Sequence, residues 1–188
     1  MTRTQGTRRL AATLASLAVA GTLAEGLPAL ADEGHGVDGF AGYSYAELGN
    51  ASRHGGSLAL AFDLAGPASV FVDLSAHRGS QGGLDRDDLT LMAGPGVRIG
   101  RRGGTVFFAR ALAGLVRDAS SVSVLDVSIS EASTRFGVMG GAGVDLRLAP
   151  RWAARAQGDY LWHEAAGGGK RSGFRVAAGV VYRFGAAP

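Results

Sequence analysis

The chain has 188 residues, a formal charge of +3 and no cysteine. This length suits one domain rather than two, and a chain without cysteine gives no indication of its redox compartment. Three arginines and one glutamate lie within residues 1–31, so the remainder carries a formal charge near +1. The composition therefore gives no reason to expect a nucleic acid or another polyanion as a partner.

The first 31 residues have the three parts of a secretory signal peptide. Basic residues, among them Arg8 and Arg9, precede an uncharged and mostly apolar run over residues 10–24. Ala-Leu-Ala at 29–31 is a small-x-small cleavage signal. The apolar run is too short for a membrane-spanning helix, and no later stretch approaches about 18 uncharged apolar residues. We therefore expect export through the Sec route, removal of residues 1–31, and one domain over residues 32–188.

Five segments in the first part of this domain alternate apolar with polar residues. That period is typical of strands with two different faces. In the second segment, for example, Leu58 and Leu60 alternate with Ser57 and end beside Asp63. The expected strands cover residues 37–46, 57–65, 69–78, 88–99 and 105–117.

The C-terminal third has the cleanest alternation and predicts three more strands, over 135–148, 152–163 and 174–184. In the last of them Phe174, Val176 and Tyr182 lie on one face, and Arg175 and Arg183 on the other. None of the three apolar faces contains a charged residue. Eight strands are therefore expected.

The connections between these strands alternate in length. Tight turns rich in glycine and proline are expected at 66–67, 100–104 and 149–150, and longer polar loops near 47–56, 79–87, 118–134 and 164–172. Short turns at one end and long loops at the other are typical of an antiparallel up-and-down barrel in a membrane. An even number of strands brings both termini to the end with the short turns.

Alternation alone does not say which face points outward, since a soluble barrel has the same period. Two features favour an apolar face in contact with lipid. Glycines are frequent on the mixed face, where a narrow interior crowded with arginine needs small neighbours. Aromatic residues lie near both ends of the apolar faces, about 23 Å apart in depth for ten tilted residues, as expected for two girdles at the membrane surfaces. The expected girdle residues are Tyr43, Tyr45, Trp152, Tyr160, Trp162, Phe174, Tyr182 and Phe184.

The mixed face supplies the candidate functional residues. Buried charges must be paired or hydrated, so the first interpretation is a network of ion pairs and water that fills the barrel. The alternative is a selective conduit for small anions, which an eight-stranded barrel has little room for. The predicted interior polar residues are Asp63, Asp73, His77, Arg98, Arg110, Asp145, Arg147, Arg155, Gln157, Asp159, Arg175 and Arg183.

An enzyme requires a nucleophile and a base, and Asp73, Ser75 and His77 share one strand face. Barrels that modify lipid A use His and Ser, and these catalytic groups must face the membrane to reach the lipid. The period-two alternation of this strand instead places Ser75 and His77 on the inward face. The four histidines show no metal-ligand spacing. We therefore expect no catalytic, cofactor-binding or metal-binding residues. Lys170 and Arg171 in the last predicted loop, with Arg53 and Arg78 at other loops, could meet lipopolysaccharide phosphates.

The domain resembles the small outer-membrane β-barrel proteins of the OmpA-like and OmpX-like type, often described as porin-like. The segments that carry the resemblance are 37–45, 91–96, 141–147, 157–160 and 174–184. The resemblance implies a monomeric outer-membrane protein in contact with membrane lipids and lipopolysaccharide. It also implies recognition of the terminal aromatic, here Phe184, by the barrel-assembly machinery, although Gly-Ala-Ala-Pro follows that residue.

The function expected from these observations is non-enzymatic, in envelope structure or in surface interaction. Three alternatives remain open from the sequence: a small-solute channel of the porin type, a lipid-modifying barrel enzyme, and a soluble periplasmic β-barrel.

Overall fold

A computed structural model describes residues 36–48, 51–81, 84–124, 127–164 and 169–184. The predicted signal peptide, its cleavage point and the residues after Phe184 lie outside the described residues. Among the described residues, no helix is long and apolar enough to cross a membrane.

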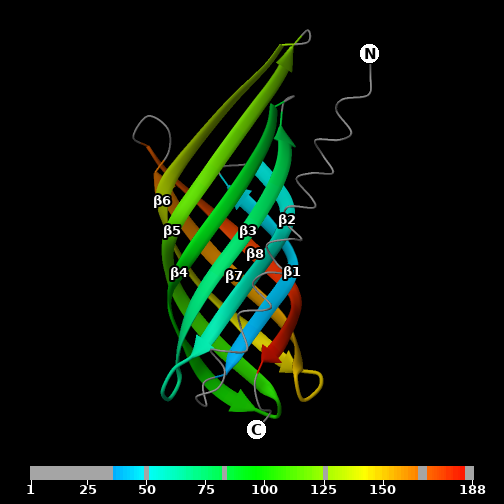
Figure 1. Ribbon diagram of the computed structural model, residues 1–188, viewed down its shortest axis with the longest axis vertical. Coiled ribbons are helices and arrows are strands. Elements are labelled where there is room, and N and C mark those ends of the chain that lie inside the picture. The colour runs from blue at the N-terminus through cyan, green and yellow to red at the C-terminus, as the bar shows by residue number, and fades with distance from the viewer. Residues whose placement is uncertain (1–35, 49–50, 82–83, 125–126, 165–168, 185–188) are drawn as a thin grey trace.

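The chain forms a closed antiparallel barrel in which each strand pairs with the next and β1 pairs with β8 (Figure 1). This confirms the predicted eight-stranded up-and-down topology. The strands are β1 Val37–Leu48, β2 Ala51–Asp63, β3 Ala68–Gln81, β4 Leu84–Arg102, β5 Thr105–Val124, β6 Val127–Arg147, β7 Trp152–Glu164 and β8 Lys170–Phe184.

The tight turns lie at the end of the barrel where β1 begins and β8 ends, as expected. Gly66, Gly103 and Gly104 have φ values of 68°, 57° and 86°. Residues with a Cβ rarely adopt this left-handed conformation, so glycine permits the sharp reversals there.

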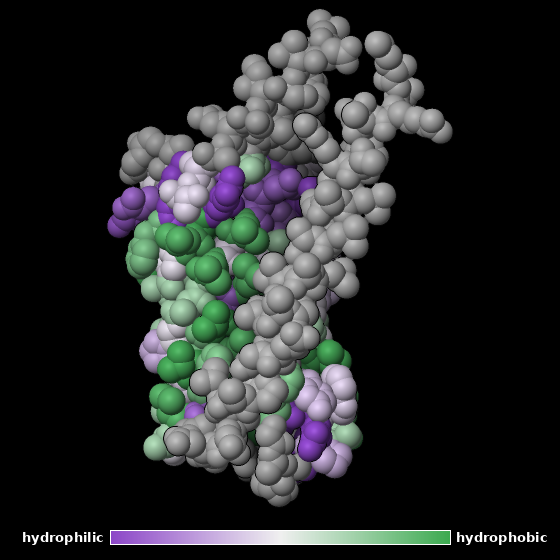
Figure 2. Space-filling view, in the orientation of Figure 1, coloured by the Kyte–Doolittle hydropathy of each residue, from purple (hydrophilic) through white to green (hydrophobic). Residues whose placement is uncertain are grey.

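Alternate residues of each strand face the lumen and the outer surface of the barrel. Along β7, Ala153, Arg155 and Leu161 are buried, while Trp152 and Tyr160 are exposed. On the face seen in Figure 2, apolar residues occupy the middle of the barrel, and hydrophilic residues gather toward its ends. The charged residues of the middle of the barrel therefore face the lumen, and the apolar residues of the opposite parity face outward.

The predicted long loops are wrong in extent, because most of their residues continue the strands. The β5–β6 ladder runs on to the Val124↔Val127 pair, and the β4–β5 ladder to Asp85↔Ser121. The serines of this region belong to the polar loop predicted near 118–134. They alternate with valine and isoleucine, however, and a two-stranded ladder that extends away from the barrel needs no apolar face to keep its backbone pairing.

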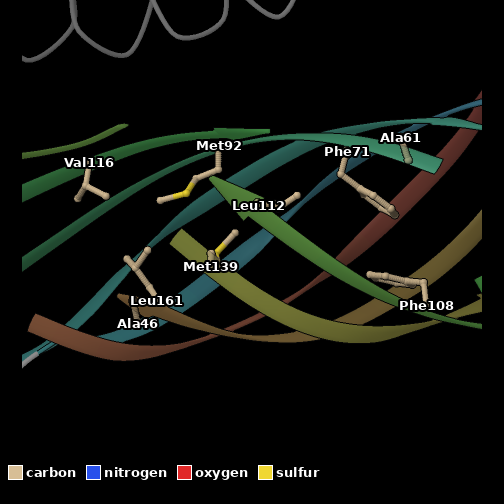
Figure 3. Packing of buried hydrophobic residues seen from close by; sticks show 9 residues of the cluster. All are labelled: Ala46, Ala61, Phe71, Met92, Phe108, Leu112, Val116, Met139 and Leu161. Carbon is tan, nitrogen blue, oxygen red and sulfur yellow. The ribbon is translucent and has the colours of Figure 1, made fainter. Parts of the chain in front are cut away.

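The lumen also contains an apolar cluster that the sequence analysis did not anticipate (Figure 3). Its two largest members, Phe71 of β3 and Phe108 of β5, stack with ring centroids 5.6 Å apart. A Cβ added to Gly96 would lie 2.4 Å from the Phe71 ring, and one added to Gly143 would lie 2.5 Å from the Phe108 ring. Glycine on the inward face therefore makes room for large side chains from neighbouring strands. The cluster consists of Ala46, Ala61, Phe71, Met92, Phe108, Leu112, Val116, Met139 and Leu161.

Candidate functional site in the barrel interior

A ring of four charged side chains crosses the middle of the lumen. Asp73 of β3, Arg110 of β5, Asp159 of β7 and Arg175 of β8 all point inward from different strands. Arg110 lies 3.2 Å from Asp73 and 2.9 Å from Asp159. Arg175 lies 2.7 Å from Asp73 and 2.8 Å from Asp159. Since β3 and β7 are opposite each other in an eight-stranded ring, this central quartet ties together opposite walls of the barrel.

The central quartet is buried and balanced in charge. The side chains of Asp73, Arg110 and Asp159 have 0% exposure, and that of Arg175 has 6%. Arg175 also donates a hydrogen bond of 2.8 Å to the Ser75 hydroxyl. A Cβ on Gly141 would lie 2.0 Å from an Asp159 carboxylate oxygen, so glycine there is needed for the carboxylate to reach its partners. Each buried charge thus has two opposite charges beside it, which is the condition for burying ions at all.

A second buried ion pair lies between β6 and β7. Arg155 donates two hydrogen bonds to Asp145, of 2.6 and 2.8 Å. Its guanidinium carbon also lies 4.6 Å from the ring centroid of Phe108 and 5.4 Å from that of Phe40. The arginine is therefore fixed by a bidentate pair in its plane and by aromatic rings.

The lumen end near the tight turns holds a further cluster. Arg98 lies 2.8 Å from both Asp38 and Asp63, and Arg183 lies 3.6 Å from Asp38. Arg147, which the sequence analysis placed in the interior, is exposed instead. Arg147 has the parity of the inward residues, but it is the last residue of β6. Its side chain therefore lies at the rim of the barrel rather than in the lumen.

Besides Arg147, two predicted interior residues lie outside these ion pairs, and both are buried. His77 is buried, and its Nε2 lies 2.8 Å from the Ser44 hydroxyl. Gln157 is buried, but its amide nitrogen and oxygen have no hydrogen-bond partner among the described residues. An amide in this position requires water or a polar solute as its partner.

The structure also places inside the lumen an ion pair that the sequence analysis missed. Arg53, expected on a loop, is buried and forms a salt bridge with Asp88 of β4. Arg78, expected where the predicted strand meets a loop, lies within β3 with its Nε 2.6 Å from Asp87 at the exposed surface. The signal was available: Arg53 has the same parity as Ser57 and Ala59, so extending the alternation of the second strand would have pointed it inward.

Ser75 and His77 do not form a nucleophile–base pair. The Ser75 hydroxyl hydrogen-bonds Arg175 and the Thr90 hydroxyl, while the His77 ring contacts Ser44. Both are buried on the lumen side, as their predicted phase required. In this geometry the serine stabilises the central quartet.

The eight predicted girdle residues all belong to the outward set and form two groups. Near the tight turns, the ring of Tyr182 packs edge-on against those of Trp152 and Phe184, with centroids 4.8 and 4.9 Å away. Toward the other end, the rings of Tyr160 and Trp162 meet edge-on at 4.4 Å. Phe174 is the cross-strand partner of Tyr160, while Tyr43 and Tyr45 both lie beside the ring of His54, which the sequence analysis did not single out.

No protein-family model matches the chain, and no curated protein matches it in sequence. Solved structures do match. Neisserial surface protein A, from Neisseria, has 15% identity and a TM-score of 0.64 over 81% of this chain and 98% of its own. Ail, the attachment invasion locus protein of Yersinia pestis, has 18% identity and a TM-score of 0.58 over 79% of this chain and 98% of its own.

The outer membrane protein OprG of Pseudomonas aeruginosa has 12% identity and a TM-score of 0.55, over 81% of this chain and 97% of its own. Each of these three chains is covered almost completely, so the similarity extends over the whole barrel and is not confined to one hairpin. At these identities it concerns the fold. The chain therefore has the small antiparallel barrel fold of these bacterial surface and outer-membrane proteins.

Proposed function

We propose that the chain is an integral outer-membrane barrel that conducts no solute and catalyses no reaction, and that acts in envelope structure or surface interaction. The observation that carries this proposal is the division of the barrel wall: apolar side chains outside, ion-paired side chains inside. A soluble barrel requires the reverse arrangement of its charged face.

The outer surface supports the membrane environment. Its exposed hydrophobic residues include Ile99, Phe136 and Leu148, at 67%, 61% and 68% exposure, together with leucines and valines from most strands. Soluble monomers rarely expose contiguous apolar areas above a few hundred square ångströms, and here all eight strands contribute exposed hydrophobic residues. Two aromatic groups border this surface, as at the two interfaces of an outer-membrane barrel.

The interior supports a closed rather than a conducting barrel. Among the described residues, the six arginines and six aspartates named at the end of this paragraph each take part in at least one ion pair. This balance leaves no excess positive charge among them to attract a small anion. The apolar cluster fills further space between them. The paired residues are Arg53, Arg98, Arg110, Arg155, Arg175, Arg183, Asp38, Asp63, Asp73, Asp88, Asp145 and Asp159.

A surface-interaction role is supported by the extended hairpins opposite the tight turns. β5 and β6 rise furthest from the barrel (Figure 1). In the described part of the chain, residues 127–136 of β6 pair with β5, while pairing with β7 begins only at Gly137. That leaves a strand edge with free backbone groups, which is the kind of edge that accepts an extended segment of another protein.

The membrane assignment is tested by fractionation and by gel migration. We expect the protein in the outer-membrane fraction, extracted only by detergent, with a folded form that migrates differently from the heated form. Release by osmotic shock, with one migration before and after heating, would instead support a soluble periplasmic barrel.

A further inference from the structure

The end of the barrel with the tight turns carries four arginines in two of those turns. Arg101 and Arg102 end β4, Arg147 ends β6, and Arg151 lies between β6 and β7. We call these four residues the turn arginines. Arg147 and Arg151 are exposed, and neither forms an ion pair with a described residue. The two turns, residues 99–104 and 147–151, contain no acidic residue.

The acidic side chains nearest this end are already engaged. Asp38 and Asp63 lie against Arg98, and Asp38 also lies 3.6 Å from Arg183. Asp145 forms the buried pair on β6 and β7 described above. The turn arginines therefore add positive charge that no described residue of this end compensates.

The two arginine-bearing turns lie side by side on the rim. The Arg147 amide donates a hydrogen bond of 2.9 Å to the Gly104 carbonyl, which joins the end of β6 to the β4–β5 turn. The Arg183 amide donates one of 2.9 Å to the Arg151 carbonyl, which joins β8 to the other turn. Neighbouring strands lie about 4.8 Å apart, so the ends of β4 and β6 are separated by roughly 10 Å. The four charges thus form one cationic patch.

This patch lies at the depth of lipid head groups rather than of acyl chains. Arg151 donates a hydrogen bond of 3.4 Å to the Tyr182 hydroxyl, and Tyr182 belongs to the aromatic group near the tight turns. Aromatic residues of outer-membrane barrels lie where the hydrocarbon meets the head groups. A guanidinium at this boundary can reach phosphates, and its planar fork suits two phosphate oxygens at once.

The opposite end of the barrel also has cations, but acidic residues lie among them. Arg78 pairs with Asp87, Lys170 is the cross-strand partner of Glu164, and the exposed Arg171 follows Lys170. Lipopolysaccharide phosphates at that end would meet charges of both signs. The formal charge near +1 of residues 32–188 hides this difference between the two ends.

We propose that the turn arginines bind the phosphates of net-anionic glycerophospholipids in the periplasmic leaflet and select these lipids over zwitterionic ones. The proposal rests on the proposed membrane location, in which short turns face the periplasm. A zwitterionic head group brings an ammonium to the patch, and the arginines repel it, whereas phosphatidylglycerol brings negative charge alone. Basic clusters beside a membrane-spanning segment attract anionic lipid for the same reason.

The test is the composition of the phospholipid that the full barrel retains. Protein in vesicles of phosphatidylethanolamine with a minor share of phosphatidylglycerol is extracted into a mild detergent at low salt, and the bound lipids are identified by native mass spectrometry. We expect phosphatidylglycerol to be enriched roughly fivefold over its share of the vesicle, the order expected for one basic residue at an anionic surface. Added salt should reduce this enrichment, since the arginines are exposed to water.

Three combined variants identify the residues responsible. Replacing all four turn arginines by glutamine should abolish the enrichment, whereas replacing them by lysine keeps the charge and should preserve it. The matched control removes four exposed cations from the opposite end and should also preserve it. The control substitutions are Arg78→Gln, Arg117→Gln, Lys170→Gln and Arg171→Gln.

A wild-type barrel that retains both lipids in the proportion of the vesicle would overturn the proposal. Equal losses in the glutamine and lysine variants would overturn it as well, because the effect would then not depend on charge, as would an equal loss in the control. Each variant must keep the heat-modifiable migration of the folded barrel. Failure of the wild type to float with the vesicles would contradict the membrane location itself, which separates the two failures.

Discussion

Replacing Asp159 by asparagine removes one negative charge from the central quartet with little change in shape. Asp159 lies between Arg110 and Arg175, and its side chain has 0% exposure. After the change, two buried guanidinium groups share the single carboxylate of Asp73. Breaking a buried ion pair from one side costs about 3–5 kcal/mol, and we expect Asp159→Asn to lower the free energy of unfolding by that amount.

The matched control is Asp87→Asn, which breaks the exposed pair with Arg78. The side chains of that pair are 76% and 54% exposed, so the expected loss is about 0–1 kcal/mol. Both variants are unfolded with urea from the same vesicles and followed by tryptophan fluorescence. Trp152 and Trp162 are suitable reporters because both lie on the outer surface, at 47% and 48% exposure.

A double variant separates charge balance from packing. Arg110→Met with Asp159→Leu leaves Arg175 paired with Asp73, and we expect it to recover most of the loss, since apolar replacements of a buried pair are often close to neutral. The reasoning is refuted if Asp159→Asn stays within about 1 kcal/mol of the wild type, the range of an exposed pair.

Three further predictions follow from separate features. Gly143→Ala should lower the free energy of unfolding by about 1–3 kcal/mol, because the added Cβ overpacks against Phe108. Gly140→Ala on the outer face should change that free energy by less than about 0.5 kcal/mol. Urea unfolding compares the two variants, and equal losses would contradict the packing account. In planar bilayers the wild-type barrel should give no steady single-channel steps, and reproducible steps would favour the small-solute channel. Replacing residues 119–132 with a short turn should leave heat-modifiable migration unchanged, because that ladder lies beyond the closed part of the barrel; loss of the folded band would show that the barrel depends on it.

Alternation predicted the strand number, the topology and the two faces, because a strand buried on one side has to repeat with period two. It did not predict where strands end. The polar loop predicted near 118–134 lies where β5 and β6 continue, although serine alternates with valine and isoleucine in that stretch of the sequence.

The interior was predictable as a set of residues but not as a set of partners. The sequence places Asp73 and Arg175 on inward faces, yet their contact joins residues 102 positions apart and depends on the stagger of the closed barrel. Arg53 was missed because its strand was begun too late. Arg147 was wrongly included because parity alone does not show where the rim lies. Phe71 and Phe108 share the parity of Asp73 and Arg110, so the alternation pointed them inward, but only the polar residues of that face were singled out.

The central claim is that the apolar outer face of the barrel contacts lipid, while the charged side chains of the inner face pair with one another in the lumen. The chain has no cysteine, so single cysteines along β7 can carry a spin label at one position at a time. Labels at the outward Ala154, Ala156 and Tyr160 should collide readily with oxygen dissolved in the bilayer and rarely with a water-soluble nickel chelate. Labels at the inward Ala153 and Leu161 should collide little with either, giving a period of two along the strand. High collision with the nickel chelate at the outward positions would contradict the account, because the apolar face would then be in water.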